Sequence, residues 1–384
     1  MLKCVVLSEI HNGKHVKIVF RDIILRIFVP VLMAAVNVAL AGAPYPQSSH
    51  ITGISWNLST LKNLAPYSDN WCITWADNDH QYTSWGDGGG FGGNQTDGRV
   101  SMGVGRIEGT KDDYTCTNVW GGKNAENPAI FKGKCYGLLA IGGTLYMWRT
   151  GDGSDANCFG FQELRKSSNY GATWDDANIR FVDPDFSGSK GFFAPTFLQF
   201  GRAYAGARDD YVYMYAPENM DDQWEVQRPG HISLMRVPTS QIIQKTAYRF
   251  FTGLDNSGNP IWSLDVNARK PVFVDPVNGV MRTSAIYNAG LKRYILMTQQ
   301  KSRFKTKDGH IGIYDAPEPW GPWTTIFFKN AWEAGIQRSD SKSKTVFWNF
   351  SSKWMSADGK RFVMVYTGLG SDEWGTVEGT FSTP

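Results

Sequence analysis

The sequence carries little charge and lacks several common functional motifs. Charged residues make up 20% of its 384 residues and the net charge is +3. That charge is too small to imply a nucleic-acid partner, and no basic run contains interleaved aromatic residues. No Gly-x-Ser-x-Gly motif is present, so a serine nucleophile of the α/β-hydrolase kind is not indicated. No cysteines or histidines have metal-ligand spacing, which argues against a zinc site.

Long apolar segments are also scarce. One apolar run, at residues 27–36, follows several basic residues and is broken by Pro30. The small-residue pattern at residues 39–43 fits a signal-peptidase site. We therefore interpret residues 1–43 as a signal peptide rather than a membrane anchor, and residues 44–384 as a single secreted domain. No other segment is long enough to span a bilayer, so stable membrane insertion is not expected.

Five cysteines are present, and Cys4 lies in the predicted signal peptide. The remaining four are Cys72, Cys116, Cys135 and Cys158. An even number in an exported chain suggests two disulfides, with the pairing left open.

Glycine and aromatic residues are abundant, with 41 Gly and 15 Trp. This composition favours β-structure over helices. A unit of an apolar strand, a turn and an aromatic-rich strand recurs at residues 71–87, 138–149, 197–215, 284–299 and 354–368. Five such units predict an all-β, five-bladed β-propeller, and a two-sheet β-sandwich is the alternative. Residues 167–174 resemble the Asp-box turn of sialidase-type propellers, which is a structural motif.

The first unit holds the strongest functional signal. Residues 69–87 alternate apolar and polar residues around an Asp-Asn-Asp turn, which predicts a β-hairpin. A hairpin brings its ends together, so Asp69 and Asp87 are expected to lie close, with Trp71 and Trp85 beside them as candidate substrate-binding residues. Paired carboxylates near indole rings are typical of sugar hydrolysis. A strand cap at Asp69 and a turn at Asp87 are the structural alternative.

Two later segments add candidate substrate-binding residues. Arg208 could contact a hydroxyl or carboxylate, with Asp209 orienting it, although a salt bridge in a turn explains both equally well. Arg282 and Asn288 are candidate hydrogen-bonding residues, although a hairpin turn also accounts for Asn288.

Several motifs together resemble the family called domain of unknown function 4185. They lie at residues 68–77, 86–88, 195–201, 205–213, 288–294 and 353–359. The resemblance runs from about residue 55 to the C-terminus. Part of that family is glycoside hydrolase family 183, the endo-D-arabinanases, which are five-bladed propellers that cut D-arabinan by inversion. The resemblance implies that Asp69 and Asp87 match the catalytic pair.

The sequence thus predicts a secreted glycoside hydrolase that cleaves a polysaccharide, most specifically an endo-acting, inverting arabinofuranan hydrolase. The more buried aspartate should be the acid, because desolvation raises a carboxyl pKa. A polysaccharide lyase is one alternative, with His80 or a tyrosine as base and Arg208 or Arg282 binding a uronate. A non-catalytic glycan-binding propeller is another. We expect a monomer without cofactor, although acidic turns leave a structural calcium ion possible.

Overall fold

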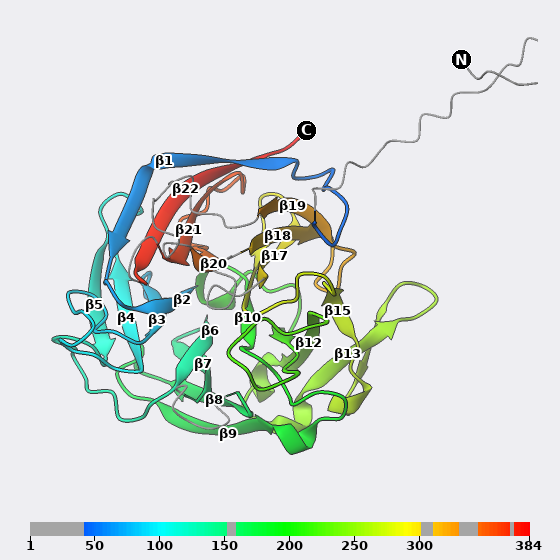
Figure 1. Ribbon diagram of the computed structural model, residues 1–384, viewed down its shortest axis with the longest axis horizontal. Coiled ribbons are helices and arrows are strands. Elements are labelled where there is room, and N and C mark those ends of the chain that lie inside the picture. Colours follow the sequence, from blue (N-terminus) through cyan, green and yellow to red (C-terminus); the bar gives the residue numbers. More distant parts are fainter. Residues whose placement is uncertain (1–41, 152–158, 301–309, 330–344, 369–371) are drawn as a thin grey trace, which may run out of the picture. The chain divides into compact units, whose positions relative to one another are not determined.

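The described part of the chain folds almost entirely into β-strands connected by turns (Figure 1). This computed structural model describes residues 42–151, 159–300, 310–329, 345–368 and 372–384. The described residues all belong to one compact unit. Nearly all of the predicted signal peptide, and Cys158, therefore lie outside the described residues.

The strands are β1 (Gly53–Leu64), β2 (Asp69–Trp75), β3 (Gln81–Gly86), β4 (Met102–Glu108), β5 (Thr115–Trp120), β6 (Lys134–Ile141), β7 (Thr144–Thr150), β8 (Phe161–Ser167), β9 (Asp175–Val182), β10 (Thr196–Gln199), β11 (Tyr211–Pro217), β12 (His231–Pro238), β13 (Arg249–Leu254), β14 (Pro260–Ser263), β15 (Pro271–Val274), β16 (Thr283–Asn288), β17 (Arg293–Gln300), β18 (His310–Ala316), β19 (Thr324–Lys329), β20 (Val346–Phe350), β21 (Arg361–Thr367) and β22 (Trp374–Ser382). The helices of the described residues are short 3-10 turns: η1 (Asp183–Asp185), η2 (Arg202–Tyr204), η3 (Thr239–Gln241), η4 (Lys245–Ala247) and η5 (Val266–Ala268).

The strands form antiparallel sheets of consecutive strands, which confirms the all-β prediction. Strands β2–β5 form one four-stranded sheet and β6–β9 another. A larger sheet contains two antiparallel groups, β10–β14 and β16–β19, joined by a short parallel pairing of β10 with β16. In the last sheet, β1 pairs with β22 and so joins the beginning of the described chain to its end.

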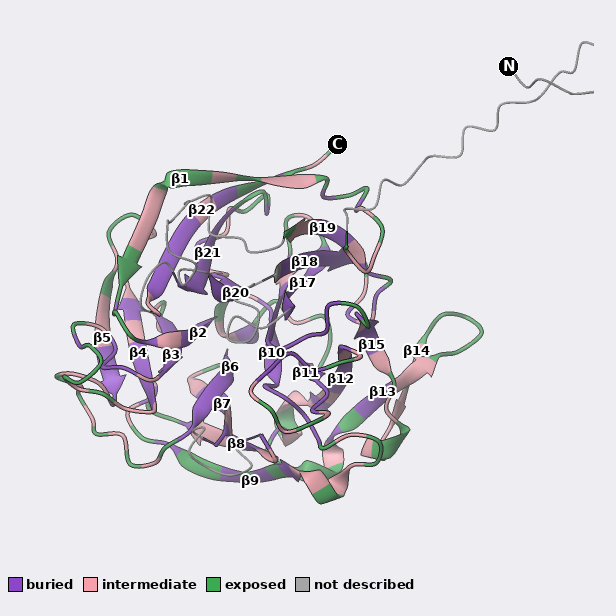
Figure 2. Cartoon of the chain, viewed as in Figure 1, coloured by how far each residue is buried: buried purple, intermediate pink, exposed green. Residues whose placement is uncertain are grey.

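The innermost strands are β2, β6, β10, β16 and β20, which contact one another in that order, and β20 contacts β2. Side chains link these strands directly. Thr74 Oγ1 donates to Gln199 Oε1 at 2.9 Å, and Gln199 Nε2 donates to the Leu138 carbonyl at 2.9 Å. The cavity between them is only about 10 Å³, so they form a packed core rather than an open channel. The inner strands are buried along their length (Figure 2).

Neighbouring inner strands run in the same direction, so their first residues lie at the same end. The Cys72 thiol donates to the Cys135 carbonyl near the beginning of β2 and β6, and Ala140 N donates to Thr74 Oγ1 near their ends. The β10–β16 pairing is likewise parallel. Residues that begin β2, β6 and β16 therefore share one end of the inner strands, which we call the Asp69 end. The turns that follow these strands lie at the opposite end.

Tryptophan side chains fill the spaces between sheets. Trp71 of β2 packs edge-on against Trp374 of β22, with ring centroids 5.3 Å apart, and both rings are fully buried. This contact fixes the first sheet against the last, because large aromatic rings supply much buried area and prefer edge-to-face geometry.

The turn predicted at residues 167–174 forms as expected. Asn169 Oδ1 accepts hydrogen bonds from Ser167 Oγ and from the Thr173 backbone N–H, each at 2.9 Å. The Trp174 ring is buried, and its Nε1 donates to the Gly171 carbonyl at 3.0 Å. The motif is therefore structural, as predicted.

Candidate active site

Asp69 is positioned by an irregularity at the start of the β2–β3 hairpin. It pairs with Gly86, and the register shifts between Asp69 and Cys72. Asn70, between them, has φ of 60° and its backbone N–H donates to Thr367 Oγ1 at 2.9 Å. The Asn70 side chain donates to Asp69 Oδ1 at 2.7 Å. The bulge thus redirects the chain and fixes the Asp69 carboxyl at the Asp69 end.

Gly86 leaves room for that carboxyl. A Cβ atom placed on Gly86 would lie 2.7 Å from Asp69 Oδ1 and 3.0 Å from Cδ of Lys134. Both distances are shorter than ordinary van der Waals contacts, so a larger residue would displace one of these side chains. The glycine is therefore required by the packing around Asp69.

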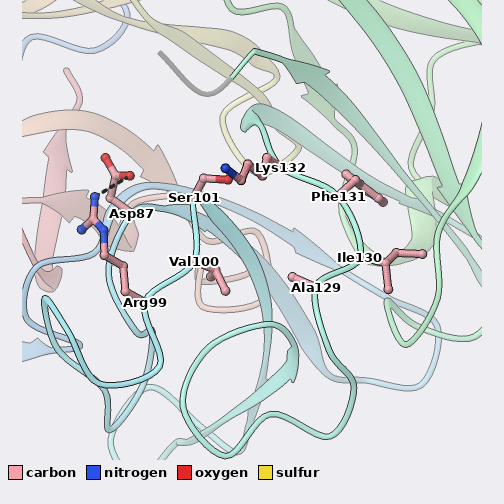
Figure 3. A pocket seen from close by; sticks show the side chains of 8 residues that line it. All are labelled: Asp87, Arg99, Val100, Ser101, Ala129, Ile130, Phe131 and Lys132. Carbon is pink, nitrogen blue, oxygen red and sulfur yellow. Dashed lines mark hydrogen bonds and ion pairs between the residues drawn. The ribbon is translucent and has the colours of Figure 1, made fainter. Parts of the chain in front are cut away.

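Asp87 directly follows β3 and is held by two cations. Its backbone N–H donates to the Ser101 carbonyl at 3.1 Å. Its Oδ1 lies 2.7 Å from Lys134 Nζ and 3.1 Å from Arg99 Nη2. Asp87 and Arg99 also line a pocket of about 620 Å³, which continues along residues 100–101 and 129–132 (Figure 3). The predicted hairpin therefore brings both aspartates to the same end, and Asp87 opens onto a pocket.

Asp69 has a perturbed protonation equilibrium. It keeps partial contact with solvent but is otherwise enclosed by protein, and this desolvation raises its pKa to about 7. Lys134 and Arg282 counteract the rise, whereas Asp372 and Asp87 add to it. Near neutral pH the carboxyl is thus divided between its protonated and ionised forms, as a general acid requires.

Arg282 immediately precedes β16 and is buried close enough to Asp69 to affect its pKa. Its Nη1 donates to Gln299 Oε1 at 2.7 Å, and its guanidinium lies 4.7 Å from the Trp224 ring centroid. Its Nε has no hydrogen-bond partner among the described residues. Of the predicted substrate-binding residues, Arg282 is the one that the structure brings to Asp69.

The sequence reasoning missed Lys134, Arg99 and Asp372. Lys134 begins β6, as Asp69 begins β2. Because aligned inner strands bring their first residues together, the position of Lys134 at the start of a repeated strand was the sequence signal that could have identified it. Arg99 and Asp372 do not begin an inner strand.

The structure corrects the role expected for the two indoles. Trp71 and Trp85 are both fully buried. The Trp85 ring lies so close to Gly103 that a Cβ atom there would be 2.3 Å from it. Both rings belong to the core between strands and cannot stack on a sugar.

Arg208 and Asp209 lie at the opposite end, between β10 and β11. Arg208 lies 4.9 Å from the Trp320 ring centroid and contacts Glu318, and its Nε is 3.3 Å from Asp209 Oδ2. Asp209 also accepts a hydrogen bond from Tyr213 Oη at 2.7 Å. The structure therefore favours the salt bridge in a turn over a role beside Asp69.

Asn288 and His80 also lie at the opposite end. Asn288 is fully buried, and its side chain donates to the Gly359 carbonyl at 2.8 Å and accepts from Leu291 N at 3.1 Å. His80 follows the β2–β3 turn and lies 3.4 Å from Glu108. Asn288 thus stabilises a turn, which corrects the expectation that it binds substrate.

The predicted disulfides do not form in the described residues. Cys72, Cys116 and Cys135 are free thiols. Cys72 and Cys135 lie on adjacent strands with their sulfur atoms 3.9 Å apart, well beyond the roughly 2.05 Å of a disulfide bond. For the third thiol, that of Cys116, burial raises the pKa to about 12, which makes this thiol unreactive.

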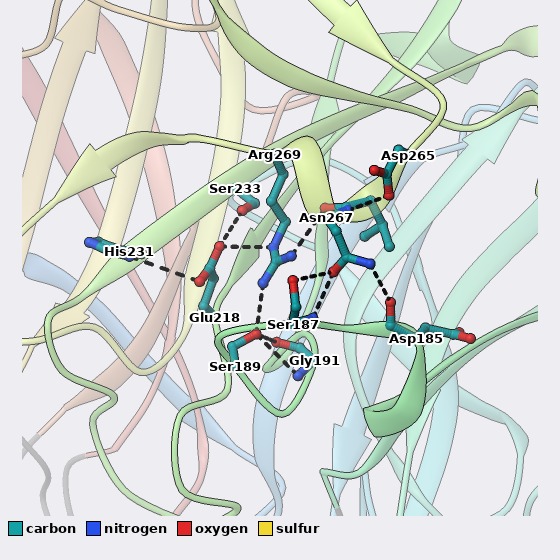
Figure 4. Close-up of polar contacts among 11 residues, drawn as sticks. Asp185, Ser187, Ser189, Gly191, Glu218, His231, Ser233, Asp265, Asn267 and Arg269 are labelled. Atoms are coloured by element: carbon teal, nitrogen blue, oxygen red, sulfur yellow. Dashed lines mark hydrogen bonds and ion pairs between the residues drawn. The ribbon is translucent and has the colours of Figure 1, made fainter.

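A second polar cluster surrounds Glu218, which follows β11 (Figure 4). Its Oε1 lies 3.0 Å from Arg269 Nε and accepts a hydrogen bond from Ser233 Oγ at 2.9 Å. Arg269 in turn donates to Ser189 Oγ at 2.8 Å. The buried carboxylate and guanidinium neutralise each other, so this cluster joins loops and offers no second acid–base pair.

Within the described ranges, no group of three or more His, Cys, Asp or Glu side chains could hold a metal ion. Across those same residues, none of the helices has the length and apolar character needed to cross a bilayer.

The fold and site define an all-β protein with two carboxylates at one end of its inner strands. The chain belongs to the family described as domain of unknown function (DUF4185), whose model matches residues 136–362, more than half of the chain. Arg282 lies within the matched residues, and both candidate aspartates precede them. A comparison with curated proteins found no match.

Solved structures with a similar chain path include a candidate hydrolase from Bacteroides ovatus, at 11% identity and a TM-score of 0.50, covering 85% of this chain and 90% of that one. This likeness shows a shared fold. An α-L-arabinofuranosidase from Podospora anserina, in complex with cellotriose, has 9% identity and a TM-score of 0.48. The match covers 83% of this chain and 91% of that one. A GH43_1 enzyme from Xanthomonas citri has 12% identity and a TM-score of 0.47. The match covers 85% of this chain and 95% of that one.

Proposed function

We propose that this protein is a glycoside hydrolase that cleaves a polysaccharide, with Asp69 and Asp87 as its catalytic pair. One observation carries the proposal: the fold brings two carboxyls to the same end of the inner strands and gives them opposite surroundings. Asp69 is desolvated, with its pKa raised to about 7, whereas Asp87 is held by Lys134 and Arg99. Glycoside hydrolysis needs one protonated and one ionised carboxyl.

The assignment of roles follows from these surroundings. Asp69 donates its proton to the glycosidic oxygen as the bond to the anomeric carbon breaks. Asp87 accepts a proton from a water molecule as the water oxygen attacks that carbon. One water is consumed and the anomeric configuration inverts. The two aspartates exchange their protonation states and recover them through solvent.

The substrate is proposed to be an arabinofuranose-containing glycan that is cut internally. The resemblance of the chain to endo-D-arabinanases supports the sugar. The pocket beside Asp87, at about 620 Å³, has room for sugar units on one side of the cleaved bond and so supports a polymeric substrate. The candidate hydrolase from Bacteroides ovatus, which shares the fold, agrees with the general class.

The proposal includes the wider organisation predicted from the sequence. Groups β2–β5, β6–β9, β10–β13, β16–β19 and β20–β22 with β1 would be the five blades of a propeller. Residues 1–43 would direct secretion, residues 44–384 would form the catalytic domain, and the enzyme would act as a monomer.

The alternatives that depend on His80, Trp71 or Trp85 have less support. A lyase that uses His80 as base would need this side chain near the bound sugar, yet His80 lies at the opposite end from Asp69 and pairs with Glu108. A non-catalytic glycan-binding protein that uses Trp71 and Trp85 as its platforms is disfavoured, because both rings are buried.

The test is a product screen with the wild type and the single variants Asp69→Asn and Asp87→Asn. We expect the wild type to release oligosaccharides from an arabinan, with inverted anomeric configuration by NMR. Each variant should lose at least about 100-fold in kcat, because acid–base catalysis contributes roughly 10²–10⁴-fold. Circular dichroism spectra should match across the three proteins. Full activity in both folded variants would refute the mechanism.

A further inference from the structure

We propose that Lys134 is a positioning residue that keeps the two aspartates in opposite protonation states. This inference rests on the proposed hydrolase function. Lys134 is the first residue of β6, and its side chain is only 6% exposed. Its Nζ lies 2.7 Å from Asp87 Oδ1 and donates to the Ser101 carbonyl at 3.2 Å.

The lysine side chain also borders Asp69. A Cβ atom on Gly86 would touch both Cδ of Lys134, at 3.0 Å, and Asp69 Oδ1, at 2.7 Å. The lysine stem therefore passes beside one carboxyl while its ammonium group binds the other. Burying an ammonium group is costly unless it is paired with an opposite charge. The neighbouring carboxyls therefore explain why a lysine is buried at this position.

The chemistry of neighbouring carboxyls explains why a cation is needed here. Two carboxyls that lie close together tend to share one proton, because the second ionisation is opposed by the first charge. A cation bound to only one of them breaks that symmetry. Lys134 pairs directly with Asp87 and only borders Asp69, so its charge favours the ionised form of Asp87 more than that of Asp69.

Other charged groups face the pair but do not replace Lys134. Arg282 and Asp372 act on Asp69 with opposite signs. Arg99 also pairs with Asp87, but its side chain is 40% exposed, so solvent screens its effect. Lys134 is therefore the buried cation that joins the two.

The experiment compares Lys134→Met, Lys134→Gln and Lys134→Arg with the wild type. In the Met and Gln variants the acidic limb of the pH–rate profile, set by Asp87, should move upward by about one pH unit, since a neighbouring cation shifts a carboxyl by roughly 1–3 units. The basic limb, set by Asp69, should move less, so the profile should narrow. The Gln variant can still donate to the Ser101 carbonyl, which separates charge from hydrogen bonding. Lys134→Arg should return the profile toward that of the wild type.

Lys245→Met is the matched control. Lys245 Nζ lies 2.8 Å from Asp185 Oδ2, but its side chain is 43% exposed. Its loss removes a lysine–aspartate pair far along the chain from both candidate aspartates and should leave the profile in place. A profile that falls equally at every pH in the Met and Gln variants would assign Lys134 a structural role and overturn the inference.

A second measurement does not depend on activity. The carboxyl carbons of Asp69 and Asp87, followed by ¹³C NMR during a pH titration, should titrate closer together in Lys134→Gln than in the wild type. An unchanged titration overturns the role of Lys134 even if the enzyme is active. If the wild type cleaves no glycan, the proposed function fails, while the titration still decides whether Lys134 controls the pair.

Discussion

Replacing Asp69 by asparagine should make the protein more stable at pH 8 while removing its activity. The Asp69 carboxyl has its pKa raised from an ordinary 3.8 to about 7, chiefly by desolvation. The folded state therefore binds more protons than the unfolded state between these values, so stability falls as pH rises through this range and is lowest above pH 7. A shift of this size corresponds to about 4 kcal/mol at 1.36 kcal/mol per unit.

Partial solvent contact reduces that figure, so we expect Asp69→Asn to gain about 2–4 kcal/mol at pH 8 and little at pH 4. The asparagine keeps the size of the side chain and can still accept the hydrogen bond from Asn70. Urea unfolding of both proteins at pH 4 and pH 8 measures the difference.

Asp112→Asn is the control, because that side chain is 73% exposed and its replacement should change stability little at either pH. The reasoning is refuted if Asp69→Asn is no more stable than the wild type at pH 8, or if its advantage is the same at both pH values. Either result would mean that the Asp69 carboxyl is not destabilised by ionisation in the folded protein.

Two further substitutions test the packing of the two ends. Gly86→Ala would place a Cβ atom 2.7 Å from Asp69 Oδ1, so kcat on arabinan should fall roughly 10- to 100-fold, as misplacing a catalytic group by about 1 Å does. Gly53→Ala, which meets no atom within 4 Å, should leave kcat unchanged; equal kcat for the two variants would contradict this view of the site. Asn288→Ala should lower the free energy of unfolding by about 1–3 kcal/mol, because it leaves the Gly359 carbonyl without its hydrogen bond. Its KM should match that of the wild type, and a raised KM with unchanged stability would restore Asn288 as a substrate-binding residue.

Local sequence patterns predicted local structure well. The alternation in residues 69–87 predicted the β2–β3 hairpin, and the turn at residues 167–174 formed around Asn169 as expected. These features depend on side-chain period and turn chemistry, which neighbouring residues determine.

Predictions that depended on long-range packing were less successful. Trp71 and Trp85 are common types at sugar sites, but alternation alone does not say which face of a strand meets another sheet. The even number of cysteines suggested disulfides, whereas the strands hold the Cys72 and Cys135 sulfur atoms 3.9 Å apart. Geometry between distant segments decided both outcomes.

Short-range periodicity and turn residues are enough to specify an all-β chain and a hairpin that holds Asp69 and Asp87 at its open end. Tertiary packing sets the surroundings of those two carboxyls. It placed Lys134 from β6 and Arg282 from the segment before β16 beside them, although these residues are remote in the sequence. The physical reason is that desolvation and charge depend on distance in space, and aligned inner strands bring their first residues to one end.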